Sequence, residues 1–407
     1  MKIFNYRLAF FFFFSLVAAC NEAHNHQAVI LAHPEKFSDT ASFVLQIDSV
    51  STIADTFASE NASATASFYD RKTDELLYYL YNHTSGELRI YSLTTKRFLK
   101  GIALKKDGAT SIGNLQALFC NTADSIFILD EAYIALIDST GTIKTRWPIN
   151  ERGARTQPFF EKYVFYTRPP SIFHYDKSTR CIYVQAYERA EFDPKSGFKT
   201  KESPGRTGFI AKYDLAAKRP DMLPVSYAAQ YSTNYYGNML QPSVNFIHAG
   251  QNCISYIFPV SPGVYTQQLN SDTANEYACL SSISTNSVEP LTWDDIDNED
   301  LKVRHFHRNV NFCRLVYTDS PACYYRFHYD KMDSGDNDFQ NVYAKKKLFL
   351  TVIDNHFSIC KELSMPIRNI HTLAAFSAKG TVYIPMVDPL RRKRNFLQFL
   401  TLKIDKK

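Results

Sequence analysis

The sequence predicts an all-β protein, a six-bladed β-propeller with degenerate four-stranded blades over residues 42–407. Beyond residue 41 the chain is rich in Phe and Tyr and has almost no long stretch of helical periodicity. A short unit recurs, in which an apolar strand ends at Asp and a tight turn follows. That strand is apolar on both faces, and small sheets packed face to face around an axis cover both faces. Paired β-sandwiches are the alternative, but they predict cleaner alternation and two domains.

The first residues, 1–19, have the layout of a signal peptide. Basic residues precede the apolar run Leu8–Val17, which is shorter than the ~20 residues of a membrane span. The Val-Ala-Ala-Cys that ends at Cys20 resembles the lipobox of bacterial lipoproteins, in which the signal is removed and the cysteine thiol carries a diacylglycerol. We therefore expect lipidation of Cys20 and anchoring to the lipid bilayer. A plain secretory signal or an N-terminal anchor helix is the alternative.

The segment that follows, residues 20–41, has no convincing periodicity and predicts a flexible tether. Loss of residues 1–19 removes two of the 46 Lys and Arg and none of the 41 Asp and Glu, so the remaining chain is close to neutral. The charges are mixed, whereas a nucleic-acid-binding protein needs a basic stripe. The basic run Arg391–Arg394 is interpreted as a solvated loop tip. We therefore exclude nucleic acid as a partner.

Six recurring strands place the blades in order along the chain. They are Glu87–Leu93, Tyr133–Asp138, Gly208–Asp214, Gly263–Asn270, Lys347–Asp354 and Asn395–Asp405. Four of them end in Asp, whose carboxylate can accept a hydrogen bond from the backbone two residues on and start the turn. Ser92 and Asn270 stand at that point in the other two, so the repeat is degenerate.

The last blade lacks one outer strand, because residues 380–405 supply an inner hairpin and the chain then stops. Ser42–Val50 is apolar and has no partner of its own, so we expect it to complete that blade and close the ring. Unequal spacing predicts insertions at Glu188–Thr207, inside blade three, and at Glu289–His307, between blades four and five. Thr292 and Asp295 have capping-box spacing, which predicts a short surface helix in the second insertion.

Sequence signatures of common catalytic sites are absent. The chain has no GxGxxG, GxxxxGK[ST], GxSxG or HExxH motif. The acidic segment Asp333–Asn341 lacks the glycine and the glutamate of an EF-hand, so we interpret it as a solvated hairpin loop. The seven cysteines other than Cys20 have no CxxC spacing, and their odd number argues against a disulfide framework. We expect no cofactor and assign no catalytic residue.

One group of histidines is a candidate site. His305 and His307 are two residues apart, and on a strand their side chains would point to one face. His248, in a predicted inner strand, is the natural third member. Such a set could bind a metal in the propeller channel or act as acid and base. The alternative is that each ring fills space and makes one hydrogen bond. We keep the three as candidate ligand-binding residues and assign no metal.

The lipobox at Cys20, the tether and the degenerate aromatic-rich repeat together resemble the uncharacterised Bacteroidota lipoproteins that are grouped as a domain of unknown function with a propeller-like fold. A more distant similarity is to six-bladed extracellular propellers of the NHL and TolB-like kind, which include binding proteins and enzymes. The resemblance implies a propeller in the bacterial cell envelope, lipid-anchored at the outer membrane, on its periplasmic or surface face. It implies no activity.

Two functions therefore stay open. The first is a binding or scaffold propeller for an envelope protein, peptide or glycan, which fits the missing motifs and the many aromatic residues. The second is an extracellular lyase or hydrolase that acts on a glycan or peptide in a histidine-lined channel. An enzyme should bring two of the candidate histidines, or a carboxylate pair, to one point. We expect binding rather than catalysis.

Overall fold

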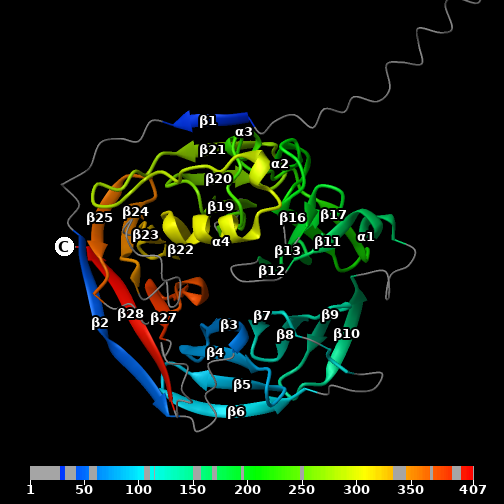
Figure 1. Ribbon diagram of the computed structural model, residues 1–407. Coiled ribbons are helices and arrows are strands. Elements are labelled where there is room, and N and C mark those ends of the chain that lie inside the picture. Colours follow the sequence, from blue (N-terminus) through cyan, green and yellow to red (C-terminus); the bar gives the residue numbers. More distant parts are fainter. Residues whose placement is uncertain are drawn as a thin grey trace, which may run out of the picture.

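The structure is a computed structural model that describes residues 28–32, 43–54, 62–104, 111–113, 115–149, 157–166, 172–193, 197–247, 252–332, 345–366, 370–386 and 396–406. Six sheets stand around a common axis, and the chain passes through them in sequence order (Figure 1). The predicted six-bladed β-propeller is therefore confirmed.

Each blade is antiparallel and runs from an inner to an outer strand. Blade I contains β3 (Ala62–Asp70), β4 (Glu75–Asn82), β5 (Glu87–Ser92) and β6 (Arg97–Ala103). Blade II contains β7 (Ala117–Thr122), β8 (Ser125–Leu129), β9 (Tyr133–Ile137) and β10 (Ile143–Pro148). Blade III begins with the helix α1 (Pro158–Lys162) and the strand β11 (Tyr163–Phe165). It continues with the strands β12 (Phe173–Asp176), β13 (Cys181–Glu188), β16 (Ile210–Asp214) and β17 (Arg219–Met222).

The second half of the ring repeats this order. Blade IV contains β18 (Ser243–Ile247), β19 (Cys253–Ile257), β20 (Val264–Gln268) and β21 (Thr273–Tyr277). Blade V contains β22 (Asn311–Asp319), β23 (Ala322–Tyr329), β24 (Leu348–Asp354) and β25 (Ile359–Ser364). Blade VI contains β26 (Phe376–Ala378), β27 (Thr381–Pro385), β28 (Phe396–Lys406) and, as its outer strand, β2 (Phe43–Ala54).

The six recurring apolar segments are the third strands of the blades. These strands, β5, β9, β16, β20, β24 and β28, each lie between two hydrogen-bonded neighbours. In β24 every residue from Leu348 to Ile353 is buried, on both faces of the sheet. Neighbouring blades cover those two faces, which is why the segments are apolar throughout rather than alternating.

The recurring Asp acts as the predicted turn device. Asp138 Oδ1 accepts a hydrogen bond from the N–H of Thr140 at 2.9 Å. Asp354 Oδ1 accepts from the N–H of His356, also at 2.9 Å. The Asp214 carboxylate accepts a hydrogen bond in the same way from the backbone N–H two residues further along the chain. Hydrogen bonds from backbone N–H groups lower the pKa of the Asp214 carboxyl. The repeat therefore has a structural cause.

The N-terminal strand closes the ring as predicted. β2 pairs with β28 from Phe43 opposite Lys406 to Ala54 opposite Phe396, and it is longer at its C-terminal end than the expected Ser42–Val50. Because β2 comes from the start of the chain and β28 from its end, one blade joins the two termini (Figure 1).

Side chains from neighbouring blades satisfy the free edge of inner strand β22. Asn245 Nδ2 donates to the carbonyl of Leu315 at 3.0 Å, and the N–H of Leu315 donates to Ser243 Oγ at 3.0 Å. Ser377 Oγ, from β26, donates to the carbonyl of Tyr317 at 2.6 Å. Blades IV, V and VI are thus joined at the axis by side chains that bond to backbone.

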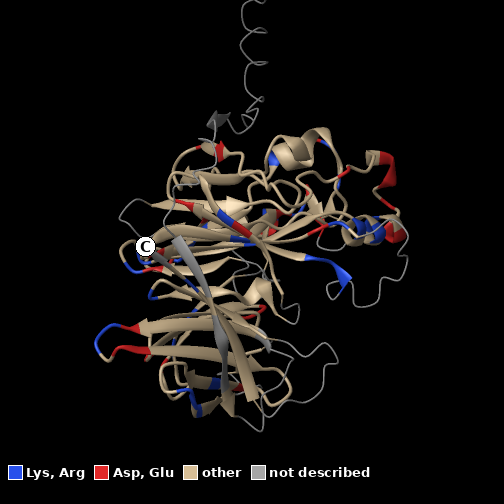
Figure 2. Ribbon diagram, turned by 90° about the vertical axis from the view of Figure 1, so that its left-hand side faces the viewer, with Lys and Arg blue, Asp and Glu red and all other residues tan. Residues whose placement is uncertain are grey.

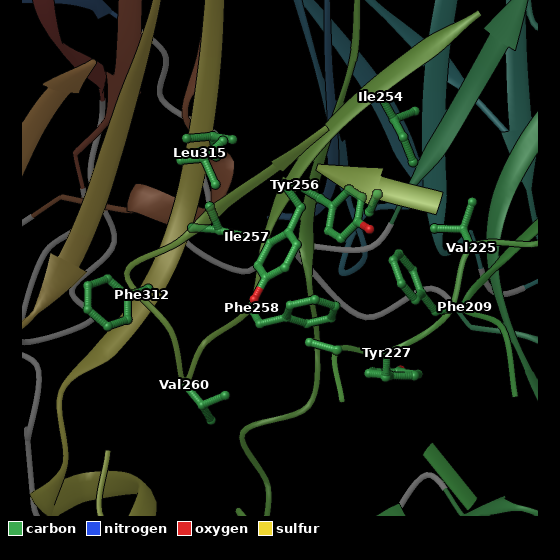
Figure 3. Packing of buried hydrophobic residues seen from close by; sticks show 14 of the residues in the cluster. Phe209, Val225, Tyr227, Ile254, Tyr256, Ile257, Phe258, Val260, Phe312 and Leu315 are labelled. Carbon is green, nitrogen blue, oxygen red and sulfur yellow. The ribbon is translucent and has the colours of Figure 1, made fainter. Parts of the chain in front are cut away.

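The insertion in blade III is part of the core. It contains β14 (Phe192–Asp193), β15 (Gly197–Phe198) and α2 (Ser203–Arg206), and a further helix, α3 (Gln230–Thr233), follows blade III. Phe192 and Phe198 are buried, and the Phe198 ring meets Tyr227 edge to face at 4.8 Å. Tyr227 belongs to the aromatic core between blades III and IV, where it lies beside Phe209 and Phe258 (Figure 3). The predicted insertion is therefore present, and its aromatic side chains pack inward.

The second insertion carries the predicted capping box and a longer helix than expected. Thr292 donates its N–H and its hydroxyl to the carboxylate of Asp295 around the short turn η1 (Trp293–Asp295). The main helix, α4 (Glu299–Arg308), begins after Asn298, whose side chain accepts from the Leu301 N–H at 3.0 Å. α4 lies over blades IV and V near the axis (Figure 1). A second short turn, η2 (Thr372–Ala374), precedes β26.

Part of the predicted tether forms a strand. β1 (Ala28–Ala32) pairs in parallel with β21, the outer strand of blade IV. Cys20 and residues 1–19, the predicted signal peptide, lie outside the described residues, as do Arg391–Arg394 and Asp333–Asn341. Among the described residues, no helix has the length and apolar character that a membrane crossing requires.

The described cysteines are all free thiols, most of them buried in strands. Acidic and basic residues are interspersed along the ribbon, and many of them lie in turns and at the ends of the strands (Figure 2). The mixed distribution agrees with the near-neutral charge of the sequence.

Candidate functional site

The candidate histidines of the second insertion lie on a helix, so the strand interpretation of this segment is wrong. His305 and His307 belong to α4. Asn298 caps this helix, Glu299 and Asp300 favour its N-terminus, and basic residues favour its last turn, so the helix signals outweigh the short alternation. Residues two apart on a helix point to different sides, so the two imidazoles do not share a face.

His305 has a structural role. Its ring is buried, and Nε2 bonds to the carbonyl of Glu289, which ties α4 to the segment before η1. Burial lowers the pKa of His305, so the ring is neutral at pH 7. This matches the alternative in which the histidine fills space and makes one hydrogen bond.

His307 lies near a buried lysine at the end of α4. Burial, followed by the positive charge of Lys346, lowers the pKa of His307. Lys346 is 2% exposed, and its ammonium donates to the carbonyl of Asn309, just after the helix. Burial lowers the pKa of Lys346 to about 8, which Asp330 partly offsets.

The third predicted residue, His248, lies outside the described residues. Within the described part of the chain, no three His, Cys, Asp or Glu side chains lie close enough together to hold a metal ion. His305 and His307 therefore form no metal-ligating set with any described residue.

A β-bulge places Arg314 beside the segment before blade VI. The β22–β23 register shifts between Phe312 and Arg314, so Cys313 is the extra residue. Arg314 donates to the Ala375 carbonyl from Nε at 3.2 Å and from Nη2 at 2.8 Å. Its side chain remains partly exposed although burial lowers its pKa to about 10. The guanidinium thus reaches from blade V to the segment before blade VI.

His371 completes a group of basic side chains. Burial, followed by the positive charge of Arg314, lowers the pKa of His371. The adjacent Thr372 hydroxyl is 3.5 Å from Cys313 Sγ, and the charges of Arg314 and Lys346 both act on this thiol. Four segments therefore meet at the start of β22. We call their side chains the basic cluster: His307, Arg314, Lys346 and His371.

Aromatic side chains lie on the inner strands of three other blades. His174, from β12, stacks on Phe246, from β18, at 4.2 Å and an interplanar angle of 7°. Phe119, from β7, meets His174 edge to face at 4.9 Å. All three keep part of their surface exposed although they lie near the axis. We call these three residues the axis aromatics.

A buried Ser–His contact in blade V does not form a nucleophile and base. Ser284 Oγ is 2.6 Å from Nε2 of His328, whose ring lies between Phe312 and Phe349. His328 Nδ1 is buried and has no hydrogen-bond partner among the described residues. A buried N–H without an acceptor is costly, so we place the proton on Nε2, which donates to Ser284. The histidine cannot then accept the serine proton.

Arg326 beside it is also structural. Its side chain is fully buried and donates to the carbonyls of Pro262 and Cys279, the latter at 2.7 Å. It also donates to Thr351 Oγ1 at 3.3 Å. These bonds link the β19–β20 loop and the segment after β21, both of blade IV, to blade V. Arg326 therefore joins two blades and does not face a ligand.

Sequence reasoning found only one member of the basic cluster, His307. Arg314 carried a signal, because it is a charged residue in an otherwise apolar strand. Lys346 stands in a run of three lysines that is typical of a solvated turn, and His371 has no distinguishing neighbours. The segments of Arg314 and His371 meet only because blades V and VI lie side by side.

A family model described as "Domain of unknown function (DUF4221)" matches residues 39–363, well over half of the chain. Among solved structures, a DUF4221 member from Bacteroides vulgatus ATCC 8482 is 15% identical, with a TM-score of 0.71, over 91% of this chain and 100% of that one. A candidate exported protein from Bacteroides fragilis NCTC 9343 is 8% identical, with a TM-score of 0.50, over 93% and 100%. Both similarities show the fold. No curated protein matches the chain.

Proposed function

Because the chain belongs to the DUF4221 family, whose description assigns no function, we propose a function from its site: an extracytoplasmic, lipid-anchored propeller that binds an envelope protein, peptide or glycan. The ligand binds where the inner strands face the axis. The basic cluster and the axis aromatics are the residues that contact it.

The observation that carries this proposal is the set of axis aromatics. Phe119, His174 and Phe246 come from three successive blades, and their rings contact one another directly. Partly exposed rings held at fixed distances suit the apolar face of a sugar or an amphipathic side chain. The surrounding blades are rigid, so little conformational freedom is lost when a ligand binds.

The sequence supports the membrane anchor. The leader and lipobox before Cys20 have the layout of a lipoprotein signal. A protein of similar fold from Bacteroides fragilis is described as a candidate for export. We propose that acylated Cys20 holds the propeller at the outer membrane, so that its ligand belongs to the cell envelope.

Neither His305 nor His328 supports the enzyme alternative. Catalysis requires titratable groups at one point. His305 is bonded inside the α4 packing, and His328 donates toward Ser284. The basic cluster offers positive charge and hydrogen-bond donors, which serve binding.

The test is ligand capture by the full chain. Purified protein is incubated with extracted envelope glycans, peptides and proteins, and bound material is identified by mass spectrometry. Phe246→Ser removes the ring on which His174 stacks, and we expect it to reduce capture at least about tenfold. Phe98→Ser, on outer strand β6, is the matched control and should capture normally.

Turnover of the captured material is measured in the same experiment. Unchanged ligand that is released intact supports binding. Capture that persists in Phe246→Ser but fails in Phe98→Ser, or ligand that is cleaved during incubation, would contradict the proposed function.

A further inference from the structure

We propose that the basic cluster is an oxyanion-binding site, which takes a carboxylate, sulfate or phosphate group of the ligand. This inference deepens the proposed function and rests on it for the identity of the biological ligand. The shared chemistry is a small anion with two or more oxygen acceptors.

The hydrogen bonds of Arg314 leave one of its nitrogens for an oxyanion. The guanidinium uses Nε and Nη2 on the Ala375 carbonyl, and its remaining nitrogen, Nη1, has no partner among the described residues. Arg314 as a whole keeps part of its surface exposed, so the cluster is not sealed inside the protein. The fixed fork of a guanidinium matches the oxygens of a carboxylate or phosphate.

The charge around the site is unbalanced within the described residues. Arg314 and Lys346 are cations, whereas Asp330 is the acid that acts on Lys346. The Asp330 Oδ1 atom already accepts from the N–H of Lys331 at 2.9 Å and of Thr285 at 3.3 Å. A bound anion would neutralise the remaining positive charge of Arg314 and Lys346, which are partly removed from water.

Burial of the Lys346 ammonium lowers the stability of the folded protein. Lys346 is buried, and its ammonium finds only the Asn309 carbonyl as a hydrogen-bond acceptor in the described part of the chain. A buried lysine without an ion pair destabilises the fold. A bound anion removes that cost, so the site should stabilise the folded protein when it is filled.

The pH dependence has a definite sign. His307, His371 and Lys346 all have lowered pKa values, and an anion beside them raises each pKa. Binding therefore takes up protons, and affinity should rise as pH falls from 9 to 6. Burial raises the pKa of the neighbouring Cys313 thiol to about 11, so this thiol stays protonated across the range and does not reverse the trend.

The test measures anion binding by the full chain without any biological ligand. Sodium acetate, sulfate and phosphate are titrated against chloride at constant ionic strength, and the thermal midpoint and heat of binding are recorded at pH 6 and pH 9. We expect a saturable stabilisation that is larger at pH 6. Stronger binding of sulfate than of acetate identifies a dianion site, and stronger binding of acetate identifies a carboxylate site.

Variants locate the site. Arg314→Gln and Lys346→Met should each weaken anion binding roughly ten- to hundredfold, because each loses a charge-assisted hydrogen bond. Arg219→Gln, exposed on outer strand β17, removes the same charge and should bind normally. Arg314→Lys keeps the positive charge, and it replaces Arg314→Gln in the comparison if that variant does not fold.

The outcomes separate this inference from the proposed function. Equal anion binding by wild type and Lys346→Met, or no saturable binding at pH 6, overturns the oxyanion site. If the propeller captures an envelope ligand that acetate, sulfate and phosphate do not displace, the oxyanion inference is wrong and the proposed function stands. If anions bind as expected but no envelope ligand is captured, the oxyanion site stands and the proposed function fails.

Discussion

Closure of the ring by β2 predicts a large difference between two isoleucines of the same strand. Ile53 is 1% exposed and packs against residues of blades I and VI. Ile47, on the same strand, is 38% exposed. Ile53→Ala should therefore lower the free energy of unfolding far more than Ile47→Ala.

The magnitude follows from the buried carbon atoms. Each substitution removes three carbons, worth roughly 0.8 kcal/mol each when fully buried, or about 2.4 kcal/mol. At Ile53 a cavity remains between two blades, which raises the expected loss to about 3–4 kcal/mol. At Ile47 about three-fifths of that transfer energy is lost and solvent fills the space, so we expect about 1–1.5 kcal/mol.

The assay is urea denaturation of the full chain, followed by tyrosine and tryptophan fluorescence and by circular dichroism. If the free energy of unfolding depends on urea concentration with the same slope in both variants, their midpoint shifts can be compared directly. The reasoning predicts a midpoint shift at least twice as large for Ile53→Ala. Equal shifts, or a larger one for Ile47→Ala, would refute closure of the ring by β2.

Three further predictions concern pH, the insertion and the anchor. Burial holds the pKa of His328 well below its usual value, so its contribution to stability should be complete above about pH 6.5 and be lost below it, by up to about 1.4 kcal/mol per pH unit; a denaturation midpoint that stays flat from about pH 6.5 to pH 5 contradicts this. Phe198→Ala should cost about 3–5 kcal/mol in chemical denaturation, whereas Lys199→Ala, at the exposed next position, should cost less than about 1 kcal/mol; similar losses would show that the insertion is not core. Cys20→Ser should abolish incorporation of labelled fatty acid and leave the precursor uncleaved, and an acyl-labelled variant would disprove lipidation at Cys20.

Most of the fold can be predicted from the repeated unit, because the repeat has a local cause. An apolar strand followed by Asp needs cover on both faces and starts its own turn, and both properties can be read from a few adjacent residues. Asp138 and Asp354 make the expected backbone contacts. The strand Ser42–Val50 was assigned to the last blade because an unpaired apolar segment and an incomplete blade require each other.

The site could not be predicted in the same way. The interpretation of 302–309 as a strand failed because a two-residue alternation is weaker evidence than the cap at Asn298 and the charges of the first turn. Arg314 and His371 are far apart in sequence and meet only because blades V and VI are neighbours. The inward packing of Phe198 depends on the shape of the aromatic core, which local patterns do not encode.

The central claim is that the axis of the propeller binds an envelope ligand. The most direct measurement is photo-crosslinking in intact cells, with a photoreactive residue at Ser67 on inner strand β3 or at Arg97 on outer strand β6. The account predicts a specific cross-linked species from Ser67, one that weakens when Phe246 is replaced by Ser, and none from Arg97. A species that forms from Arg97 alone, or one from Ser67 that is unchanged by Phe246→Ser, would contradict it.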